Sequence, residues 1–243
     1  MNQNDLNEIN ILMGKIATIA MIIPIILSIL NYNYLNKALK IIFWFCLARI
    51  IVSLINVLII WATGNYKSFF MPILNKLNIH DMNFIAILSV LSNFGLLGWY
   101  FYKVIENRKI ASLVKVTSLF LFITAIINYL FIEGYSHQSV YNSTTSSIFC
   151  FLLPVVDLWF VYKQDNKVPI VKNPYLWVNL GLFVPNLLIF IFAIVGKKLS
   201  QTDLSSYRIL DIASSGVQII GYLFIATAFY YARYTKYLPQ QTT

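Results

Sequence analysis

Seven long apolar stretches, separated by short polar segments, are the feature that most constrains how this 243-residue chain can fold. A bilayer core about 30 Å thick requires about 20 mostly apolar residues in a helix, because lipid offers no partner for an unpaired backbone group. The stretches cover approximately residues 9–30, 39–63, 84–104, 113–132, 143–162, 175–195 and 209–232. The sequence therefore predicts an all-α, polytopic membrane protein in which residues 1–243 form a single seven-transmembrane-helix bundle.

The composition agrees with a membrane protein and excludes the soluble classes. Hydrophobic residues make up 59% of the chain and charged residues only 11%, against roughly 25% charged residues in an ordinary soluble domain. Aromatic residues such as Trp61, Trp99 and Tyr162 stand at the ends of the stretches, where amphipathic rings suit the depth of the lipid headgroups.

The distribution of lysine and arginine predicts the orientation of the bundle. One set of loops, together with the C-terminal tail, holds eleven basic residues, and the opposite set holds five. Because basic residues of short loops stay on the cytoplasmic side, we expect the N-terminus outside and the C-terminus inside. The acidic start, with Asp5 and Glu8, lacks the basic region of a cleavable signal peptide, so the first span is expected to be retained. The net charge of +9 is then a consequence of topology, and no nucleic acid is predicted as a partner.

Arg49 and Asp157 are ionisable side chains that lie inside the predicted spans. In hydrocarbon such groups are costly, and they normally face the bundle interior or a wet cavity. Arg49 lies near the middle of the second span, and Asp157 lies one or two turns above the cytoplasmic end of the fifth. The sequence therefore suggests a buried Arg49–Asp157 ion pair, either purely structural or linked to a ligand.

Other polar side chains recur at helical spacing and indicate a common polar face. Arg49, Ser53 and Asn56 share one stripe of the second span, and Ser89 and Asn93 share one of the third. A cluster in the outer half of the bundle is predicted to form a ligand pocket that opens to the non-cytoplasmic side. Its residues are Asn142, Thr145, Asn186, Asp211, Ser215 and Gln218. The alternative is hydrogen bonding between helices, worth about 0.6 kcal/mol per contact.

The residues of the chain do not support a particular chemistry. The two histidines, His80 and His137, fall on predicted outer loops, and there is no HExxH zinc motif, GxSxG elbow or phosphate-binding loop. Cys46 and Cys150 lie within apolar spans, where the role of a small apolar side chain is expected. We therefore predict no catalytic residue, no metal site and no cofactor.

The last span has a weak likeness to the retinal-carrying helix of microbial rhodopsins around Asp211. In those proteins a lysine four residues after the aspartate forms the Schiff base, and Ser215 stands at that position here. The seventh span contains no lysine, so a retinal pigment is not expected. Only a likeness at the level of the fold remains.

A closer resemblance covers the chain from about Phe84 onward. It lies in the runs LGWYFYK (97–103), IINYLFIEG (126–134) and KNPYLWVNLG (172–181). With these runs the chain resembles a large family of uncharacterised bacterial seven-helix integral membrane proteins, in which a phrase like NPxFWINxG opens the sixth span. Members often carry acidic residues in the third and fifth spans, where this chain has Asn93 and residues 143–147. The resemblance implies a bacterial origin and a multi-pass place in the inner membrane, but no reaction.

Together these observations favour a receptor-like or accessory sensory membrane protein. A small ligand from the non-cytoplasmic side would perturb the pocket, and the Arg49–Asp157 pair would transmit a helix shift. A cytoplasmic or membrane protein partner would then dock on the basic face; lipid and topology alone also explain that face. The face comprises Lys103, Arg108, Lys109, Lys163, Lys167 and Lys172. The alternatives are a small-solute or ion carrier, a structural subunit of a membrane complex, and an enzyme acting on a lipid.

Overall fold

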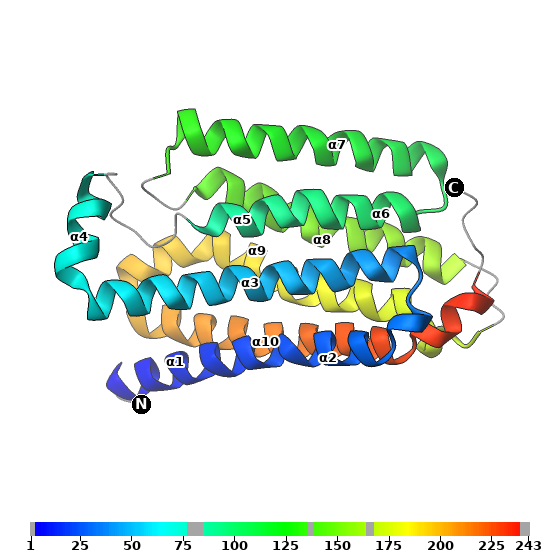
Figure 1. Cartoon of the computed structure of the whole chain (residues 1–243), viewed down its shortest axis with the longest axis horizontal. Coiled ribbons are helices and arrows are strands. Elements are labelled where there is room, and N and C mark those ends of the chain that lie inside the picture. The colour runs from blue at the N-terminus through cyan, green and yellow to red at the C-terminus, as the bar shows by residue number, and fades with distance from the viewer. Residues whose placement is uncertain (1–2, 77–84, 136–138, 164–167, 239–243) are drawn as a thin grey trace.

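The computed structural model describes residues 3–76, 85–135, 139–163 and 168–238, and every regular element in these ranges is a helix. The long helices lie side by side in one bundle (Figure 1). Six helices in the described ranges are long and apolar enough to cross a membrane. They are Asp5–Leu30, Lys37–Asn65, Arg108–Ile132, Val140–Lys163, Pro174–Phe192 and Leu204–Tyr230. The chain is thus a multi-pass, all-α membrane protein, as the sequence predicts.

Asparagine side chains start three of the long helices. α3 (Lys37–Asn65) begins after Asn36, α7 (Arg108–Ile127) after Asn107, and α9 (Pro174–Thr202) after Asn173. Each asparagine accepts a hydrogen bond of 3.0 Å from a backbone N–H of the first turn, which satisfies a donor that the helix itself cannot pair. α10 (Leu204–Tyr230) begins in the same way after Asp203.

The first span is divided into α1 (Gln3–Ala20) and α2 (Ile22–Leu30) at Met21. Pro24 explains the position of this break. A proline has no backbone N–H, and its ring clashes with the carbonyl four residues earlier, which here belongs to Ala20. The two helices nevertheless follow one another along the bundle and pack against α10.

The predicted third span forms a helix of three parts. α5 (Ala86–Ser92) continues as the π-helical turn η3 (Asn93–Leu97) and then as α6 (Gly98–Val104). This helix packs against α3 and α7 and runs along the bundle with them (Figure 1). It contains Asn93 and Lys103 and is less apolar than the six helices named above.

α8 (Val140–Lys163) runs along the bundle and follows α7 and the π-helical turn η4 (Asn128–Ile132). The short elements lie at the two ends of the bundle. α4 (Lys67–Lys76) lies across one end, where the sequence suggests only a polar connection (Figure 1). Three short 3₁₀ helices lie at the other end, namely η1 (Tyr32–Tyr34), η5 (Ile170–Lys172) and η6 (Ala232–Tyr237). The described part of the chain begins with α1 at the α4 end and finishes with η6 at the opposite end.

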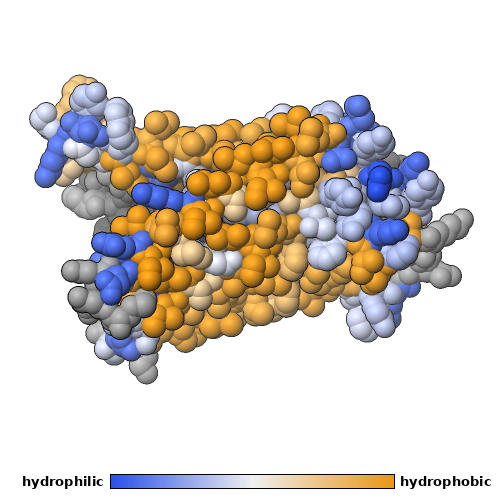
Figure 2. All heavy atoms as spheres, turned by 90° about the horizontal axis from the view of Figure 1, so that it is seen from below, coloured by the Kyte–Doolittle hydropathy of each residue, from blue (hydrophilic) through white to orange (hydrophobic). Residues whose placement is uncertain are grey.

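The surface has a broad apolar band between two hydrophilic ends (Figure 2). The end formed by η1, η5 and η6 carries many lysines and arginines, and we call it the basic end. Its described basic residues are Lys37, Lys40, Lys103, Arg108, Lys109, Lys115, Lys163, Lys172, Arg233 and Lys236. The opposite end is called the α4 end.

The buried apolar core fills the half of the bundle next to the basic end. In α3 every buried residue lies between Ala38 and Cys46, and none follows Arg49. At the interface of α9 and α10 the backbones approach closely, since a Cβ atom placed on Gly181 would lie 2.7 Å from the carbonyl oxygen of Gly221. The half next to the α4 end is packed less densely in its interior and contains the two cavities around Arg49 that are described below.

Candidate functional site

A polar cavity of about 170 Å³ lies inside the bundle, between α3, α5, η3, α8 and α9. It extends from Ser139 and Tyr129 near the α4 end to Arg49 in the middle of α3. Most of its lining is made of small hydroxyl and amide side chains. The polar lining residues are Arg49, Ser89, Asn93, Tyr129, Ser139, Asn142, Ser143, Ser146, Ser147 and Asn186.

A second cavity of about 240 Å³ lies on the other side of Arg49, next to Ser53 and Asn56. Arg49 and Ser89 line both cavities, so the guanidinium group stands where the two spaces meet. Arg49 is also the one charged residue among those that line them. It is the thirteenth residue of α3 and therefore lies about 18 Å along that helix, at 1.5 Å per residue.

No carboxylate neutralises Arg49 within the described ranges. Its side chain interacts with the hydroxyl group of Tyr222 on α10 and lies near the thiols of Cys46 and Cys150. These partners are neutral groups. An arginine held inside a bundle at this depth, with neutral neighbours and open space on two sides, is a site that attracts an anion.

Hydrogen bonds orient the amide side chains of the cavity wall. Asn93 donates from Nδ2 to the Ser146 hydroxyl at 2.7 Å, and Asn186 donates to the Leu182 carbonyl at 2.7 Å. Asn142 is 2% exposed and donates from Nδ2 to the Ala125 carbonyl at 3.1 Å, but its own Oδ1 atom is buried without a partner. The wall therefore retains an unused acceptor as well as several hydroxyl groups.

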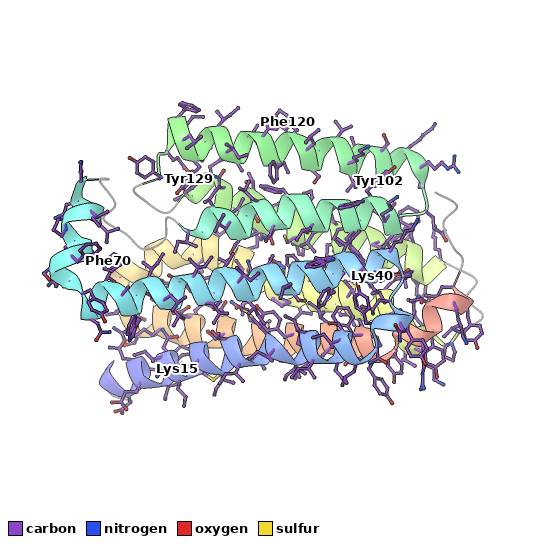
Figure 3. All side chains as sticks on the ribbon, viewed as in Figure 1. Lys15, Lys40, Phe70, Tyr102, Phe120 and Tyr129 are labelled. Atoms are coloured by element: carbon purple, nitrogen blue, oxygen red, sulfur yellow. The ribbon has the colours of Figure 1, made fainter. Side chains whose placement is uncertain are left out.

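Both π-helical turns contribute a side chain to this cavity. Asn93 is the first residue of η3, and Tyr129 belongs to η4 at the α4 end of α7 (Figure 3). A π-helical turn contains an extra residue relative to an α-helix and so rotates the side chains that follow it, which is why such turns are frequent at functional sites. Helical spacing in the sequence predicts the faces of Ser89 and Asn93, but it cannot reveal these turns.

At the edge of the cavity nearest the α4 end, a carboxylate forms hydrogen bonds that link the end of α7 to the start of α8. Glu133 accepts hydrogen bonds from the Ser139 hydroxyl, from Asn128 Nδ2 at 2.8 Å and from the backbone N–H of Tyr141 at 3.2 Å. Desolvation raises the pKa of Glu133, but these hydrogen bonds outweigh it, and the pKa lies below its ordinary value. Ser139 in turn accepts from the backbone N–H of Asn142 and so aligns the start of α8.

The predicted Arg49–Asp157 ion pair is not present in the structure. Asp157 is 1% exposed and accepts a hydrogen bond of 2.6 Å from Asn179 Nδ2, while Arg49 faces the cavities. The two residues lie at different depths, since Asp157 is only six residues, or about 9 Å, from the basic end of α8. An amide rather than a cation is therefore the partner of this carboxyl group.

Of the six residues predicted for the ligand pocket, the structure brings two together. Asn142 and Asn186 line the first cavity. Thr145 donates to the carbonyl of Tyr141 in its own helix at 2.8 Å, and Asp211 accepts from Asn10 of α1 at 2.8 Å. Asp211, Ser215 and Gln218 line neither cavity, because the face of α10 that carries Asp211 packs toward α1.

The phrase NPYLWVNLG at the start of α9 is explained by folding contacts. Asn173 caps the helix and Pro174 occupies its first position, where a missing N–H costs nothing. Trp177 donates from Nε1 to the Val171 carbonyl at 2.7 Å, and Asn179 donates to Asp157. Gly181 allows the close approach to α10. Each of these residues thus helps to place α9.

The described residues contain no cluster of three or more histidine, cysteine, aspartate or glutamate side chains that could hold a metal ion. His80 and His137, the two histidines considered in the sequence, lie outside the described residues, as does Lys167 of the predicted basic face.

Comparison with known proteins yields no relative. No protein-family model matches the chain, and no significant match is found among curated proteins or solved structures. The fold and the cavity define the class of protein: a multi-pass α-helical membrane protein whose internal cavity is lined by an arginine. A proposal for its function must therefore be based on this structure.

Proposed function

We propose that this chain is a receptor-like or accessory sensory membrane protein that binds a small anionic ligand at Arg49. One observation carries this proposal: Arg49 is the one charged residue that lines both cavities, and no carboxylate in the described ranges neutralises it. A ligand carboxylate or phosphonate would supply the missing charge and would accept bidentate hydrogen bonds from the guanidinium. The wall of serine and asparagine side chains would hold the remaining polar groups of the ligand.

We propose seven membrane passes, with the N-terminus outside and the C-terminus in the cytoplasm. The helix at 86–104 supplies the pass beyond the six most apolar helices. The basic end would be cytoplasmic, and its lysines lie over aromatic rings, as interfacial residues commonly do. Lys163 lies 4.2 Å from the Trp159 ring centroid, and Lys40 lies 4.8 Å from that of Tyr32. The cavity, which extends toward the α4 end, would then receive its ligand from the non-cytoplasmic side.

The packing of the basic half favours a receptor over a carrier. A carrier needs a route from the ligand to each side of the membrane in turn. Below Arg49 the bundle interior is filled by buried side chains, including Phe94, Phe149 and Cys46. Signalling would instead use the basic end as the surface for a cytoplasmic or membrane protein partner.

Ligand-dependent thermal stability of the purified protein in nanodiscs tests this proposal. The probes are succinate, benzoate and methylphosphonate, each beside an uncharged amide of similar size. We expect at least one anion to raise the Tm of the wild-type protein, and we expect the Arg49→Gln variant to lose this shift. Lys15→Gln is the matched control, because it removes one positive charge from an exposed position on α1 (Figure 3).

Three outcomes would contradict the proposal. A Tm shift that is retained in the Arg49→Gln variant would show that the anion binds at a site other than Arg49. The absence of a shift with every anion, together with a protein subunit that co-purifies with wild type and variant alike, would favour a structural subunit. Uptake of a labelled anion into proteoliposomes would favour a carrier.

A further inference from the structure

A recess on the outer surface of the bundle lies between the helix at 86–104 and α7. It has a volume of about 470 Å³ and is separate from the cavities around Arg49. Most of its wall is apolar, and the two lysines that line it belong to opposite walls. Its lining residues are Phe94, Gly95, Gly98, Trp99, Tyr102, Lys103, Lys115, Ser118, Leu119 and Phe122.

Two glycines and one hydrogen bond explain why the recess exists. Gly98 allows α7 to approach, and the Ser118 hydroxyl donates to the carbonyl of Phe94 within the π-helical turn. Gly95 leaves space in front of the Phe122 ring, since a Cβ atom at this position would lie 3.6 Å from that ring. The helices are thus joined at Ser118 but remain apart on their outer side.

The end of the recess next to the basic end carries two converging ammonium groups. Lys103 of α6 and Lys115 of α7 each lie 5.3 Å from the centroid of the Tyr102 ring. Tyr102 lies between these two helices at the basic end (Figure 3). None of the residues that line the recess is acidic. The recess therefore combines an apolar slot at membrane depth with a doubly positive opening at the level of the headgroups.

We propose that this recess binds an anionic phospholipid, with one acyl chain in the apolar slot and the phosphate between Lys103 and Lys115. Basic pockets between helices on the cytoplasmic side are suited to anionic headgroups. An acyl chain joined to a phosphate group matches this combination of an apolar slot with two ammonium groups at one end. This inference does not depend on the ligand proposed for Arg49.

Native mass spectrometry with added lipid tests the inference on the full chain. The probes are phosphatidylglycerol and phosphatidylcholine with identical acyl chains. We expect the wild-type protein to bind phosphatidylglycerol more tightly, and we expect Lys103→Gln with Lys115→Gln to weaken this binding about tenfold. Lys163→Gln with Lys236→Gln is the matched control, because it removes the same charge from the same end of the bundle, away from the recess. The control pair is expected to bind like the wild-type protein.

A second set of variants tests the slot while keeping both lysines. Gly95→Leu would fill it from one wall, and Leu119→Trp from the other, where Leu119 is 60% exposed. Either variant that retains the wild-type Tm is expected to lose phosphatidylglycerol binding about as strongly as the lysine double variant. An equal loss of phosphatidylglycerol binding in the Lys163→Gln, Lys236→Gln control would overturn the inference, because it would indicate a general effect of charge. Equal binding of the two lipids by the wild-type protein would also overturn it.

Discussion

The two halves of this bundle are built from the same helices but pack in different ways. Toward the basic end, Leu39, Phe101 and Phe229 are fully buried and form a continuous apolar core. Toward the α4 end the same helices enclose two cavities and an arginine. The change occurs within single helices, as α3 shows, where the buried positions end before Arg49.

This difference suggests that the two halves of the bundle have different roles, one in packing the helices and the other in binding a ligand. Close packing in the basic half fixes how the helices are arranged, because an interior at crystal-like density tolerates little displacement. The half around Arg49 has room for a ligand and carries hydroxyl and amide groups that can bind it. The contrast can be tested by variants placed in each half.

The largest effect is expected where α9 and α10 touch. In Gly221→Ala the new methyl group would overlap the Pro185 ring and lie 2.8 Å from the carbonyl oxygen of Gly181, so the helices must separate. We expect a loss of about 1–3 kcal/mol in the free energy of unfolding, as for other overpacked cores. Thermal unfolding followed by tryptophan fluorescence would measure this loss.

Gly216→Ala provides the control on the same helix. There the new methyl group would meet only Met13 Cε, at 3.6 Å, and replacing a glycine within a helix normally stabilises it. We therefore expect an unchanged or higher Tm. Equal losses in the two variants would contradict the proposed difference in packing.

A smaller effect is expected from the buried carboxyl group in the apolar half. Asp157→Leu removes the acceptor of the Asn179 amide, and Asn179 is fully buried. An unpaired buried amide costs about 1–3 kcal/mol, partly offset here by the gain of an apolar side chain. Asp157→Asn keeps a carbonyl oxygen that can accept the same hydrogen bond, so it should lose less stability in a denaturant titration. If the leucine variant were as stable as the asparagine variant, the hydrogen bond would not contribute to packing of this half.

The smallest effect is expected at the edge of the open half, in the dependence of stability on pH. The pKa of Glu133 is lowered in the folded protein by its hydrogen bonds from Ser139, Asn128 and Tyr141. A lowered pKa stabilises the folded state above the ordinary glutamate pKa of about 4.3, and this contribution disappears as the pH falls through the lowered value. We expect the Tm of the wild-type protein to fall more steeply than that of Glu133→Gln between about pH 6 and pH 3. Parallel curves would show that Glu133 does not couple acid to this end of the bundle.

The spans could be predicted from sequence because apolar length acts within a single helix, but α7 and α10 begin at Arg108 and Leu204, five residues before the predicted starts. Apolar length predicts the six most apolar helices, and Asn173-Pro174 marks the start of α9 as the rules of helix capping require. Helical spacing also placed Ser89 and Asn93 on one face, and both line the cavity. The sequence did not reveal α4, which is too short and too polar to be recognised by apolar length.

The partners of the polar side chains could not be predicted in the same way. Arg49 and Asp157 are costly groups to bury, so the sequence predicts that they pair. In the structure they lie at different depths, the Asp157 carboxyl group accepts from Asn179, and Arg49 lines the cavities. The stripe of Asp211 on α10 has the spacing of a cavity face, but Asn10 of α1 occupies it. In both cases the polar residue was placed on a plausible helix face, but the side chain that pairs with it in the structure is not the predicted one.

The sequence by itself determined that this protein is a multi-pass helical bundle and which side chains share a face. These properties follow from apolar length and a period of 3.6 residues, both of which act within one helix. Only the tertiary structure decided that Arg49 faces two cavities, that Asp157 pairs with an amide, and that the basic half is the dense one. The reason is that rotation and depth of one helix against another are set by packing across interfaces, and two π-helical turns shift that register where the cavity lies.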